Sequence, residues 1–345
     1  MAAEKLDAFL VSSAANVRYL SGFTGSNGLL LVLSAGGAIL FTDPRYRIQA
    51  SLEADCRVRV GTGPLLGHVL PVLRKKKSRR VAFERSRMTF EMYQSLKEGL
   101  PLKSSAEPVA GWIELQRMIK SDAEIALIRH SVLVNSRAFE RAVSGVRVGK
   151  SEKDLAAELD YQMRRLGAEG AAFETIVATG ARTALPHAQP TAAVFGANSL
   201  ILVDMGAMCE GYASDMTRML FLGRPGSRVK RAYAAVLEAQ LAGIAAVKAG
   251  VEAQVVDRAA RRVLRRHGLE RAFVHSTGHG LGLEIHEPPR LGKRDRTMLV
   301  PGMAITIEPG VYLEGFGGIR IEDTVVVTHN GCEVLTPTPK TLRIL

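Results

Sequence analysis

The sequence predicts two domains: an α/β domain over residues 1–112 and an α+β domain with a curved antiparallel sheet over residues 113–345. Three observations carry this prediction. The chain has 345 residues, about twice the length of a common domain. In the first part, short apolar strand patterns alternate with helical patterns. In the second part, two capped helices precede strands in which β-branched residues flank acidic ones.

The first domain is predicted to alternate strands and helices. Residues 29–33 and 38–42 are apolar runs separated by a glycine-containing turn, which is typical of a β-hairpin. The whole apolar stretch, residues 28–41, is interrupted by glycines and is too short to span a membrane. Further strands are expected at 8–12, 58–60 and 80–83, and helices at 45–54, 65–76 and 89–100.

The second domain begins near Gly111 and opens with two predicted helices. Ser121 and Glu124 have the spacing of a capping box, which marks a helix start. Apolar residues follow at helical spacing, at Ile125, Leu127, Ile128, Val132 and Val134. Ser151 and Asp154 mark a second helix that is expected to run to about residue 166. We expect both helices to back the antiparallel sheet.

A histidine-rich segment and four acids are the main candidates for chemistry. The segment HSTGHGLGLEIHEPP, residues 275–289, places three histidines among glycines that allow close approach of backbone and ligands. Four acids lie in or beside β-branched runs that predict buried strands: Asp204, Asp215, Glu308 and Glu322. Buried carboxylates are costly unless they are paired or bind a cation. We therefore expect the acids and one histidine to converge on metal.

This ligand set predicts two divalent metal ions. Four carboxylates balance the charge of two such ions, and an oxygen-rich set without thiolate favours Mn²⁺, although Co²⁺, Fe²⁺ or Zn²⁺ would also fit. Asp204 and Asp215 flank a turn at Glu210 and Gly211, so the two arms of one hairpin can bring both carboxylates together. Cys209 lies in this turn but is not expected to be a ligand, because hard metal ions disfavour sulfur.

The order and surroundings of these residues resemble the pita-bread metallopeptidase family over essentially the whole chain. The resemblance rests on five residues in order, with the motifs GHGLGLEIHE, IEPG and RIED around them: Asp204, Asp215, His279, Glu308 and Glu322. His187, His275 and the stretch NVRYLSGFTGSNG make the sequence most similar to the proline-specific branch, the Xaa-Pro aminopeptidases and prolidases. The resemblance implies a creatinase/prolidase-like N-terminal domain and a pita-bread catalytic domain. It also implies a homodimer, because in relatives the smaller domain shapes the active-site mouth of the neighbouring subunit.

The resemblance also assigns roles to the ligands. Asp204 is expected to chelate one ion, His279 and Glu308 the second, and Asp215 and Glu322 are expected to bridge both. Two ions about 3.5–4 Å apart can bind one bridging water and convert it to hydroxide at neutral pH. This hydroxide is the expected nucleophile, and Glu308 is the candidate to move its proton.

The other candidates are expected to contact the substrate. His286 would stabilise the oxyanion that develops on the substrate carbonyl. His187 would lie near the scissile nitrogen, because a prolyl nitrogen carries no proton and must acquire one to leave. His275 is expected to contact the residue on the leaving side. Three further candidates line the site, or support its ligands without touching substrate: Arg320, Tyr212 and Tyr312.

Two activities fit these residues. The expected one is an Xaa-Pro aminopeptidase, because FTGSNG and TDPRY resemble the first domain of that group. The alternative is an Xaa-Pro dipeptidase (prolidase), since the short segment LEGFGG resembles compact members that include both activities. A non-catalytic peptide-binding module and a metal-free creatinase-like hydrolase are disfavoured by the complete ligand set. A methionine aminopeptidase is disfavoured by His275 and by the extra N-terminal domain.

The resemblance implies proline-containing peptides as partners, and composition bears only on the other partner classes. The net charge of +12 comes largely from runs such as RKKKSRR at 74–80 and RRVLRR at 261–266, which lack interleaved aromatics or a nucleic-acid motif. We interpret both runs as solvated faces and expect neither a nucleic-acid nor a membrane partner. Three cysteines lack metal or redox spacing: Cys56, Cys209 and Cys332. The N-terminal residues do not match a signal peptide, so we expect a cytoplasmic protein.

Overall fold

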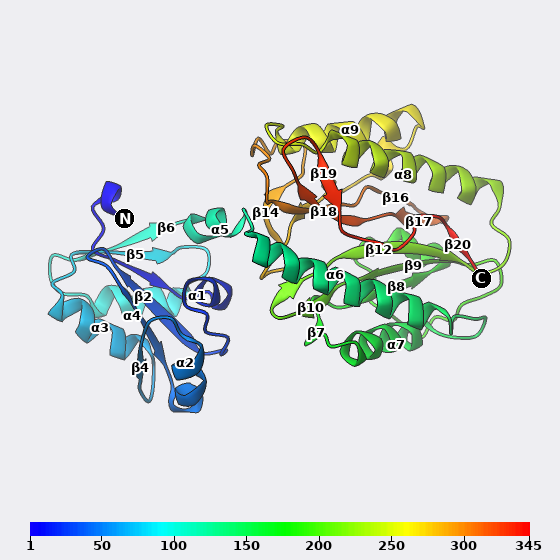
Figure 1. The fold of residues 1–345 in the computed structure, drawn as a ribbon. Helices are drawn as coiled ribbons and strands as arrows, with labels where there is room; N and C mark the ends of the chain where they lie inside the picture. Colours follow the sequence, from blue (N-terminus) through cyan, green and yellow to red (C-terminus); the bar gives the residue numbers. More distant parts are fainter. The chain divides into compact units, whose positions relative to one another are not determined.

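The computed structural model describes residues 1–345, the side chain of Ala2 excepted. The residues form two units, Met1–Arg117 and Met118–Leu345, each with its own hydrophobic cores (Figure 1). The division follows helix α5 (Trp112–Arg117). This helix belongs to the first unit because Ile113 packs in that unit's core and the Arg117 guanidinium donates a hydrogen bond to Asn16 Oδ1.

The first unit is built on a six-stranded mixed sheet in the order β4-β3-β2-β1-β5-β6. Its strands are β1 (Ala8–Val11), β2 (Gly28–Leu33), β3 (Ala38–Thr42), β4 (Arg57–Val60), β5 (Arg80–Glu84) and β6 (Ser105–Val109). The hairpin predicted from the sequence is confirmed, because β2 and β3 pair antiparallel with Gly28 opposite Thr42. Neither β6 nor helix α1 was predicted.

Helices cover both faces of this sheet. They are α1 (Ala14–Ser21), α2 (Arg47–Glu53), α3 (Leu66–Lys75) and α4 (Phe90–Gly99). Alternate residues of β2 point to opposite sides of the sheet. Leu29 and Leu31 pack with Val69 of α3, whereas Leu30 packs in the cluster that contains Val17 of α1 and Ala50 of α2. The predicted helix at 45–54 is a 3₁₀ turn (Pro44–Tyr46) followed by α2.

Four long helices belong to the second unit: α6 (Asp122–Val143), α7 (Glu152–Arg165), α8 (Ser227–Ala246) and α9 (Ala253–Arg266). Both predicted capping boxes are present, at Ser121 with Glu124 and at Ser151 with Asp154. The sequence analysis did not identify α8 and α9. These two helices pack against each other, and along the chain they lie between the two aspartates and the histidine-rich segment.

The strands of the second unit form small, mainly antiparallel sheets. One sheet has the order β20-β12-β9-β8 and is made of β8 (Ile176–Thr179), β9 (Leu200–Met205), β12 (Met216–Phe221) and β20 (Arg343–Ile344). Another has the order β14-β13-β15-β18-β19 and is made of β13 (His279–Gly280), β14 (Glu287–Arg290), β15 (Ala304–Ile307), β18 (Asp323–Val327) and β19 (Cys332–Val334). Shorter pairings join β7 (Gly170–Ala171), β10 (Ala207–Cys209) and β11 (Tyr212–Ala213), and join β16 (Gly310–Leu313) to β17 (Gly317–Arg320).

The sheets are enclosed by the two helix pairs, α6 with α7 on one side and α8 with α9 on the other (Figure 1). Strand β9 shows this arrangement residue by residue. Ile201 and Val203 pack in the α6 and α7 core, and Leu200 and Leu202 pack in the α8 and α9 core. By alternation Asp204 shares the face of Leu202. The predicted α+β pita-bread architecture with antiparallel sheets is confirmed.

The two basic runs differ in structure. Residues 74–77 are exposed at the end of α3, as expected for a solvated face. The prediction for 261–266 was wrong at Arg261, which is buried: its guanidinium binds Asp257 one turn earlier and the carbonyl oxygen of Phe273. Cys56, Cys209 and Cys332 are free thiols. No helix in the described part of the chain is long and apolar enough to cross a membrane.

Candidate active site

A tight hairpin positions the two aspartates. Strands β9 and β12 pair antiparallel with Asp204 opposite Thr217, and their continuation through β10 and β11 turns at Glu210 and Gly211. Both turn residues have positive φ, 48° and 73°, as a two-residue type I′ turn requires. Asp215 immediately precedes β12, so both carboxylates come from neighbouring strands of one sheet.

The other candidate ligands come from strand ends of the second sheet. His279 begins β13, which pairs with β15, and Glu308 directly follows β15. Glu322 lies in the short connection between β17 and β18. Thr306 joins two of these residues, because its hydroxyl accepts a hydrogen bond from the His279 backbone N–H at 3.1 Å and donates one to Glu308 Oε1 at 3.2 Å.

These side chains converge. His279 Nε2 lies 3.5 Å from Asp215 Oδ2 and 3.5 Å from Glu308 Oε1. One ligand atom each from Asp215, His279 and Glu322 lie within 4.8 Å of one another. Asp204 lines the same cavity. The fold therefore brings the five predicted ligands to one place.

Arg320 supports this cluster from behind. Its guanidinium donates to Asp204 Oδ2 and, through Nε, to the Thr217 hydroxyl at 3.0 Å. Thr217 in turn donates to Glu322 Oε2 at 2.6 Å. Asp204 Oδ1 is buried and has no hydrogen-bond partner among the described residues. A buried carboxylate oxygen without a donor is costly unless a cation binds it, so this atom fits a metal ligand.

The protonation behaviour of the acids agrees with that role. Burial raises the pKa of Asp215 and of Glu322 well above the usual range, and the neighbouring carboxylates raise them further. Burial also raises the pKa of Glu308 to about 7. These groups are unfavourable as anions beside one another, and two divalent cations would relieve both the burial cost and the repulsion. The residues present therefore fit a metal centre of two divalent ions.

Most of the predicted site residues line one cavity of about 810 Å³. They are His187, Asp204, Asp215, His275, His279, His286, Glu308, Arg320 and Glu322. His187 and His286 are exposed in its wall, and the ring of His286 lies edge-on to that of His279 with centroids 4.4 Å apart. Partial removal of the ring from water, followed by the charges of His279 and His187, lowers the pKa of His286. Both exposed histidines can reach a ligand in the cavity.

His275 is held in one orientation by its neighbours. Its Nδ1 lies 2.8 Å from the Ser276 carbonyl oxygen, which can only accept, so Nδ1 donates. Its Nε2, 2.8 Å from the Tyr312 hydroxyl, then accepts from that hydroxyl. The same hydroxyl accepts from Arg320 at 2.6 Å. Burial lowers the pKa of His275 to about 4, so the ring is neutral at neutral pH.

The two candidate tyrosines do not line this cavity. Tyr312 lies behind His275 and Arg320 and fixes both through its hydroxyl. Tyr212 packs in a separate core cluster, and its hydroxyl donates to Glu124 Oε1 at 3.0 Å. The structure therefore gives Tyr312 a supporting position and places Tyr212 outside the site.

The sequence analysis did not identify three residues of the site. Thr217 and Thr306 each lie two residues from an acidic ligand, so strand alternation could have placed them on the ligand's face. Arg290 lines the cavity four residues after His286 and its Nε donates to the Ser276 hydroxyl at 3.3 Å. No pattern around Arg290 distinguishes it from the many other arginines of the chain.

The fold and the acid–histidine cluster define a metal-dependent hydrolase, and the family models agree. Residues 126–329 match the model of metallopeptidase family M24, and residues 1–119 match the creatinase/prolidase N-terminal domain. The chain belongs to metallopeptidase family M24, whose members bind divalent metals in a dinuclear site. The family predicted from the sequence is confirmed.

Named relatives and solved structures are similar to this chain over almost its whole length. The Xaa-Pro dipeptidase of Pyrococcus horikoshii is 35% identical over 337 residues, covering 98% of this chain and 94% of the relative. The structure of an Xaa-Pro dipeptidase from Bacillus anthracis superposes with a TM-score of 0.95 at 38% identity, covering 99% of this chain and 95% of that one. The structure of an X-Pro aminopeptidase from Thermotoga maritima superposes with a TM-score of 0.92 at 37% identity, covering 99% and 98%.

Proposed function

We propose that the chain is an Xaa-Pro aminopeptidase, which hydrolyses the bond between an N-terminal residue and a following proline. One observation carries the choice of aminopeptidase. The cavity that holds the acid–histidine cluster is bordered by a second pocket that shares four of its lining residues: His275, Ser276, Arg290 and Asp295. The residues of a peptide that follow proline therefore have room beyond the cavity.

Five residues would hold the two metal ions. Asp204 would bind one ion, His279 and Glu308 the other, and Asp215 and Glu322 both. The donor set of carboxylates and one imidazole favours Mn²⁺, with Co²⁺, Fe²⁺ or Zn²⁺ as alternatives. When bound, the ions supply Lewis-acid chemistry: they lower the pKa of water and so provide a nucleophile at neutral pH.

The protein's own groups bind the peptide and move protons. Glu308 lies within the ligand cluster, 3.5 Å from His279 Nε2, and this position supports it as the proton carrier. Exposed in the cavity wall, His286 would donate a hydrogen bond to the oxyanion of the scissile carbonyl. His187 would serve the prolyl nitrogen, which needs a proton to leave. The neutral ring of His275 would contact the leaving side.

An Xaa-Pro dipeptidase is the second candidate. The relatives from Pyrococcus horikoshii and Bacillus anthracis carry that name. Arg290 supports this reading, because it places an exposed guanidinium in the cavity lining, where it could bind the carboxylate that directly follows proline in a dipeptide.

Hydrolysis of Ala-Pro and Ala-Pro-Ala by the same preparation tests the proposal. We expect hydrolysis of the tripeptide to alanine and Pro-Ala, loss of activity after chelation, and recovery with Mn²⁺ or Co²⁺. Asp215→Asn serves as the control for contaminating peptidases and should be inactive on both substrates. Turnover of Ala-Pro alone would replace the aminopeptidase by a dipeptidase, and full activity in a sample verified as metal-free would exclude both.

A further inference from the structure

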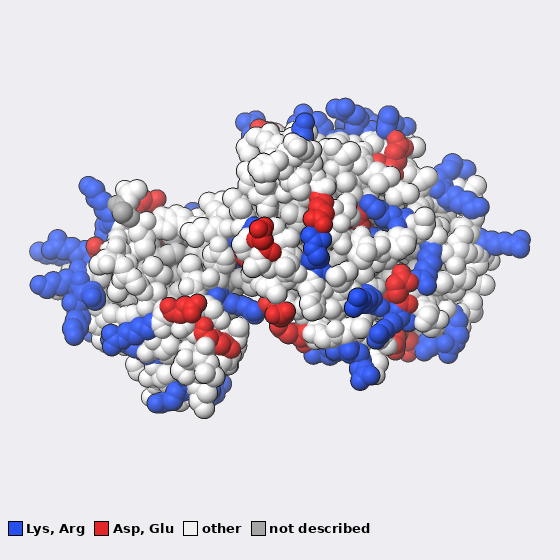
Figure 2. Space-filling model, viewed as in Figure 1, with Lys and Arg blue, Asp and Glu red and all other residues white. Residues whose placement is uncertain are grey.

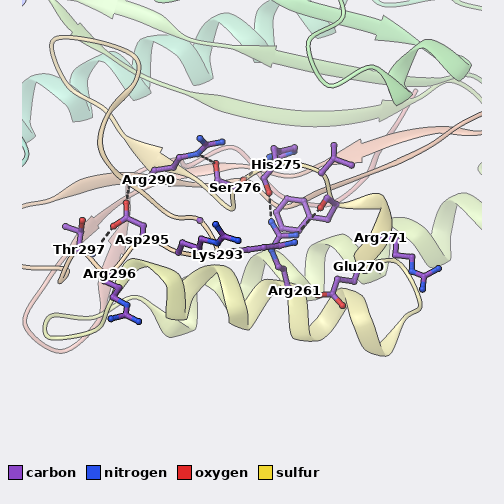
Figure 3. A pocket seen from close by; sticks show the side chains of 14 residues that line it. Arg261, Glu270, Arg271, His275, Ser276, Arg290, Lys293, Asp295, Arg296 and Thr297 are labelled. Atoms are coloured by element: carbon purple, nitrogen blue, oxygen red, sulfur yellow. Dashed lines mark hydrogen bonds between the residues drawn. The ribbon is translucent and has the colours of Figure 1, made fainter. Parts of the chain in front are cut away.

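A basic pocket of about 1190 Å³ adjoins the catalytic cavity in the second unit. It lies between α9 and the segment that follows β14 (Figure 3). His275, Ser276, Arg290 and Asp295 line both spaces, so a chain that leaves the catalytic cavity past His275 enters the basic pocket. The basic pocket is therefore continuous with the catalytic cavity.

Four cations of the lining are exposed and make no hydrogen bond or salt bridge with another described residue: Arg271, Lys293, Arg294 and Arg296. Figure 3 shows Arg271 and Arg296 toward opposite ends of the pocket with Lys293 between them. Like charges that share a pocket repel one another and create a positive potential. An anionic ligand would lower the free energy of this arrangement.

The acids of the lining neutralise only part of this charge, because six cations and two acids line the pocket. Glu270 is paired with Arg265 at 2.6 Å, and the charges of Arg261 and Lys293 also lower its pKa. Asp295 accepts hydrogen bonds from the backbone N–H groups of Arg290 and Thr297, at 2.9 and 2.8 Å, and so organises the loop itself. Arg261, the buried cation of the lining, is also committed, to Asp257 and to the carbonyl oxygen of Phe273. The exposed cations remain available.

A peptide fits the pocket better than a nucleic acid does. Lysine and arginine side chains extend along the surface over α8 and α9 (Figure 2), which could attract any polyanion. Bases, however, are usually held by exposed aromatic rings, and the aromatic side chain of the lining, Phe273, is buried. The exposed side chain of Val274 offers instead an apolar contact for the stem of an acidic residue.

We propose that the basic pocket binds acidic side chains of the substrate, so that the enzyme prefers peptides in which aspartate or glutamate follows the Xaa-Pro pair. This inference rests on the proposed aminopeptidase function, because a dipeptide has no residue that reaches the pocket. The residues that directly follow proline would pass the shared residues His275 and Arg290, so the first two of them are the ones we expect to meet the cations.

Two amidated tetrapeptides isolate the side-chain charge: Ala-Pro-Glu-Glu-NH2 and its neutral isostere Ala-Pro-Gln-Gln-NH2. At low salt we expect kcat/KM to be roughly tenfold higher for the glutamate peptide, since two or three exposed ion pairs contribute modestly each. The preference should shrink as ionic strength rises, because exposed charges are screened. The difference should lie mainly in KM, since the pocket holds no reacting group.

The charge-reversed double variant Lys293→Glu/Arg294→Glu should abolish or invert the preference. Lys230→Glu/Arg231→Glu is the matched control: it changes the net charge equally at exposed positions of α8 that do not line the pocket, and it should keep the preference. Both variants should cleave the glutamine peptide at the wild-type rate, which shows that they fold.

The outcomes separate the two proposals. Equal cleavage of both peptides by the wild type, or an unchanged preference in Lys293→Glu/Arg294→Glu, would overturn the pocket assignment and leave the aminopeptidase intact. Cleavage of Ala-Pro without cleavage of either tetrapeptide would overturn the aminopeptidase and the pocket assignment together. Equal cleavage combined with strong inhibition by an oligonucleotide would assign the cations to a polyanion instead.

Discussion

The buried carboxylates determine how the active site responds to pH. In the metal-free protein burial raises the pKa of Glu308 to about 7, and the pKa values of Asp215 and Glu322 are raised as well. Burial lowers the pKa values of His275, His279 and His286, and these groups oppose the acids below about pH 6.5. Between about pH 6.5 and 7 the acids dominate, so the folded state binds more protons than the unfolded state. The free energy of unfolding falls as pH rises through this interval.

We therefore predict that chelated protein melts at a lower temperature at pH 7.5 than at pH 6.5. Adding Mn²⁺ should raise the melting temperature more at pH 7.5, because the ligands must be deprotonated to bind metal. Glu308→Gln keeps the shape of the side chain without its titration, so the chelated variant should depend less on pH. A chelated wild type that becomes more stable from pH 6.5 to 7.5 would contradict the mutual repulsion of these acids.

His187 tests the part of the mechanism that proline requires. His187→Ala should lower kcat on an Xaa-Pro peptide by roughly 10²–10⁴, the range for a positioned acid or base. The metal content should stay unchanged, because His187 is not among the five proposed ligands. Metal content, melting temperature and kcat, measured on one preparation, distinguish a catalytic role of His187 from a structural one. A lowered melting temperature with unchanged kcat would make the residue structural.

At the scale of single residues, the acidic ligands were easier to predict than the residues that hydrogen-bond to them. Asp204 and Glu322 were identifiable because an acid inside a β-branched run needs a cation. Tyr212 was a poor candidate because its sequence neighbourhood does not reveal that its hydroxyl binds Glu124, far along the chain. The link from Arg320 through Thr217 to Glu322 likewise joins strands that are distant in sequence.

Among the elements, those with local signals were predicted and those made by tertiary contacts were not. Helix α6 carries its own capping box, and the hairpin of β2 and β3 carries its own turn. Helix α9 is rich in arginine and was interpreted as a solvated run. Its buried face instead includes Arg261, whose guanidinium binds Asp257 and the carbonyl oxygen of Phe273. No local sequence pattern indicates that an arginine of this helix will have buried hydrogen-bond partners.

A buried ion pair fixes the segment that follows His286. Lys120 Nζ, in the segment before α6, lies 3.0 Å from Glu287 Oε2 at the start of β14. The side chains are 1% and 2% exposed. Glu287 Oε1 also accepts the backbone N–H of Glu284 at 3.1 Å. The pair therefore ties the histidine-rich segment to the beginning of the second unit.

We predict that Lys120→Met lowers the free energy of unfolding by about 3–5 kcal/mol, because it leaves the Glu287 carboxylate buried without its cation. The double variant Lys120→Met/Glu287→Gln should recover much of that loss, since glutamine can still accept from Glu284. Urea unfolding of the two single variants and the double variant measures the coupling. Strictly additive losses would show that the two side chains do not depend on each other.

At the scale of the whole molecule, the fold assigns the proposed metal site to one of the two units. Each unit has its own cores, and all five proposed ligands belong to the second unit. The chain has one tryptophan, Trp112, which belongs to the first unit and packs edge-on against Phe9 with ring centroids 5.7 Å apart. Its fluorescence therefore reports the unfolding of the first unit, whereas circular dichroism reports both.

We predict that metal stabilises the second unit alone. At a free Mn²⁺ concentration 100 times the dissociation constant, binding adds about 2.7 kcal/mol. For a unit of this size that raises the melting temperature by roughly 5–10 °C. The circular dichroism transition of the second unit should move by this amount while the Trp112 fluorescence transition stays where it is in chelator. Glu322→Gln, which removes a proposed bridging ligand, should abolish most of the movement. A fluorescence transition that moves together with the circular dichroism transition would mean that the two units unfold as one cooperative body, since metal bound in the second could then stabilise the first.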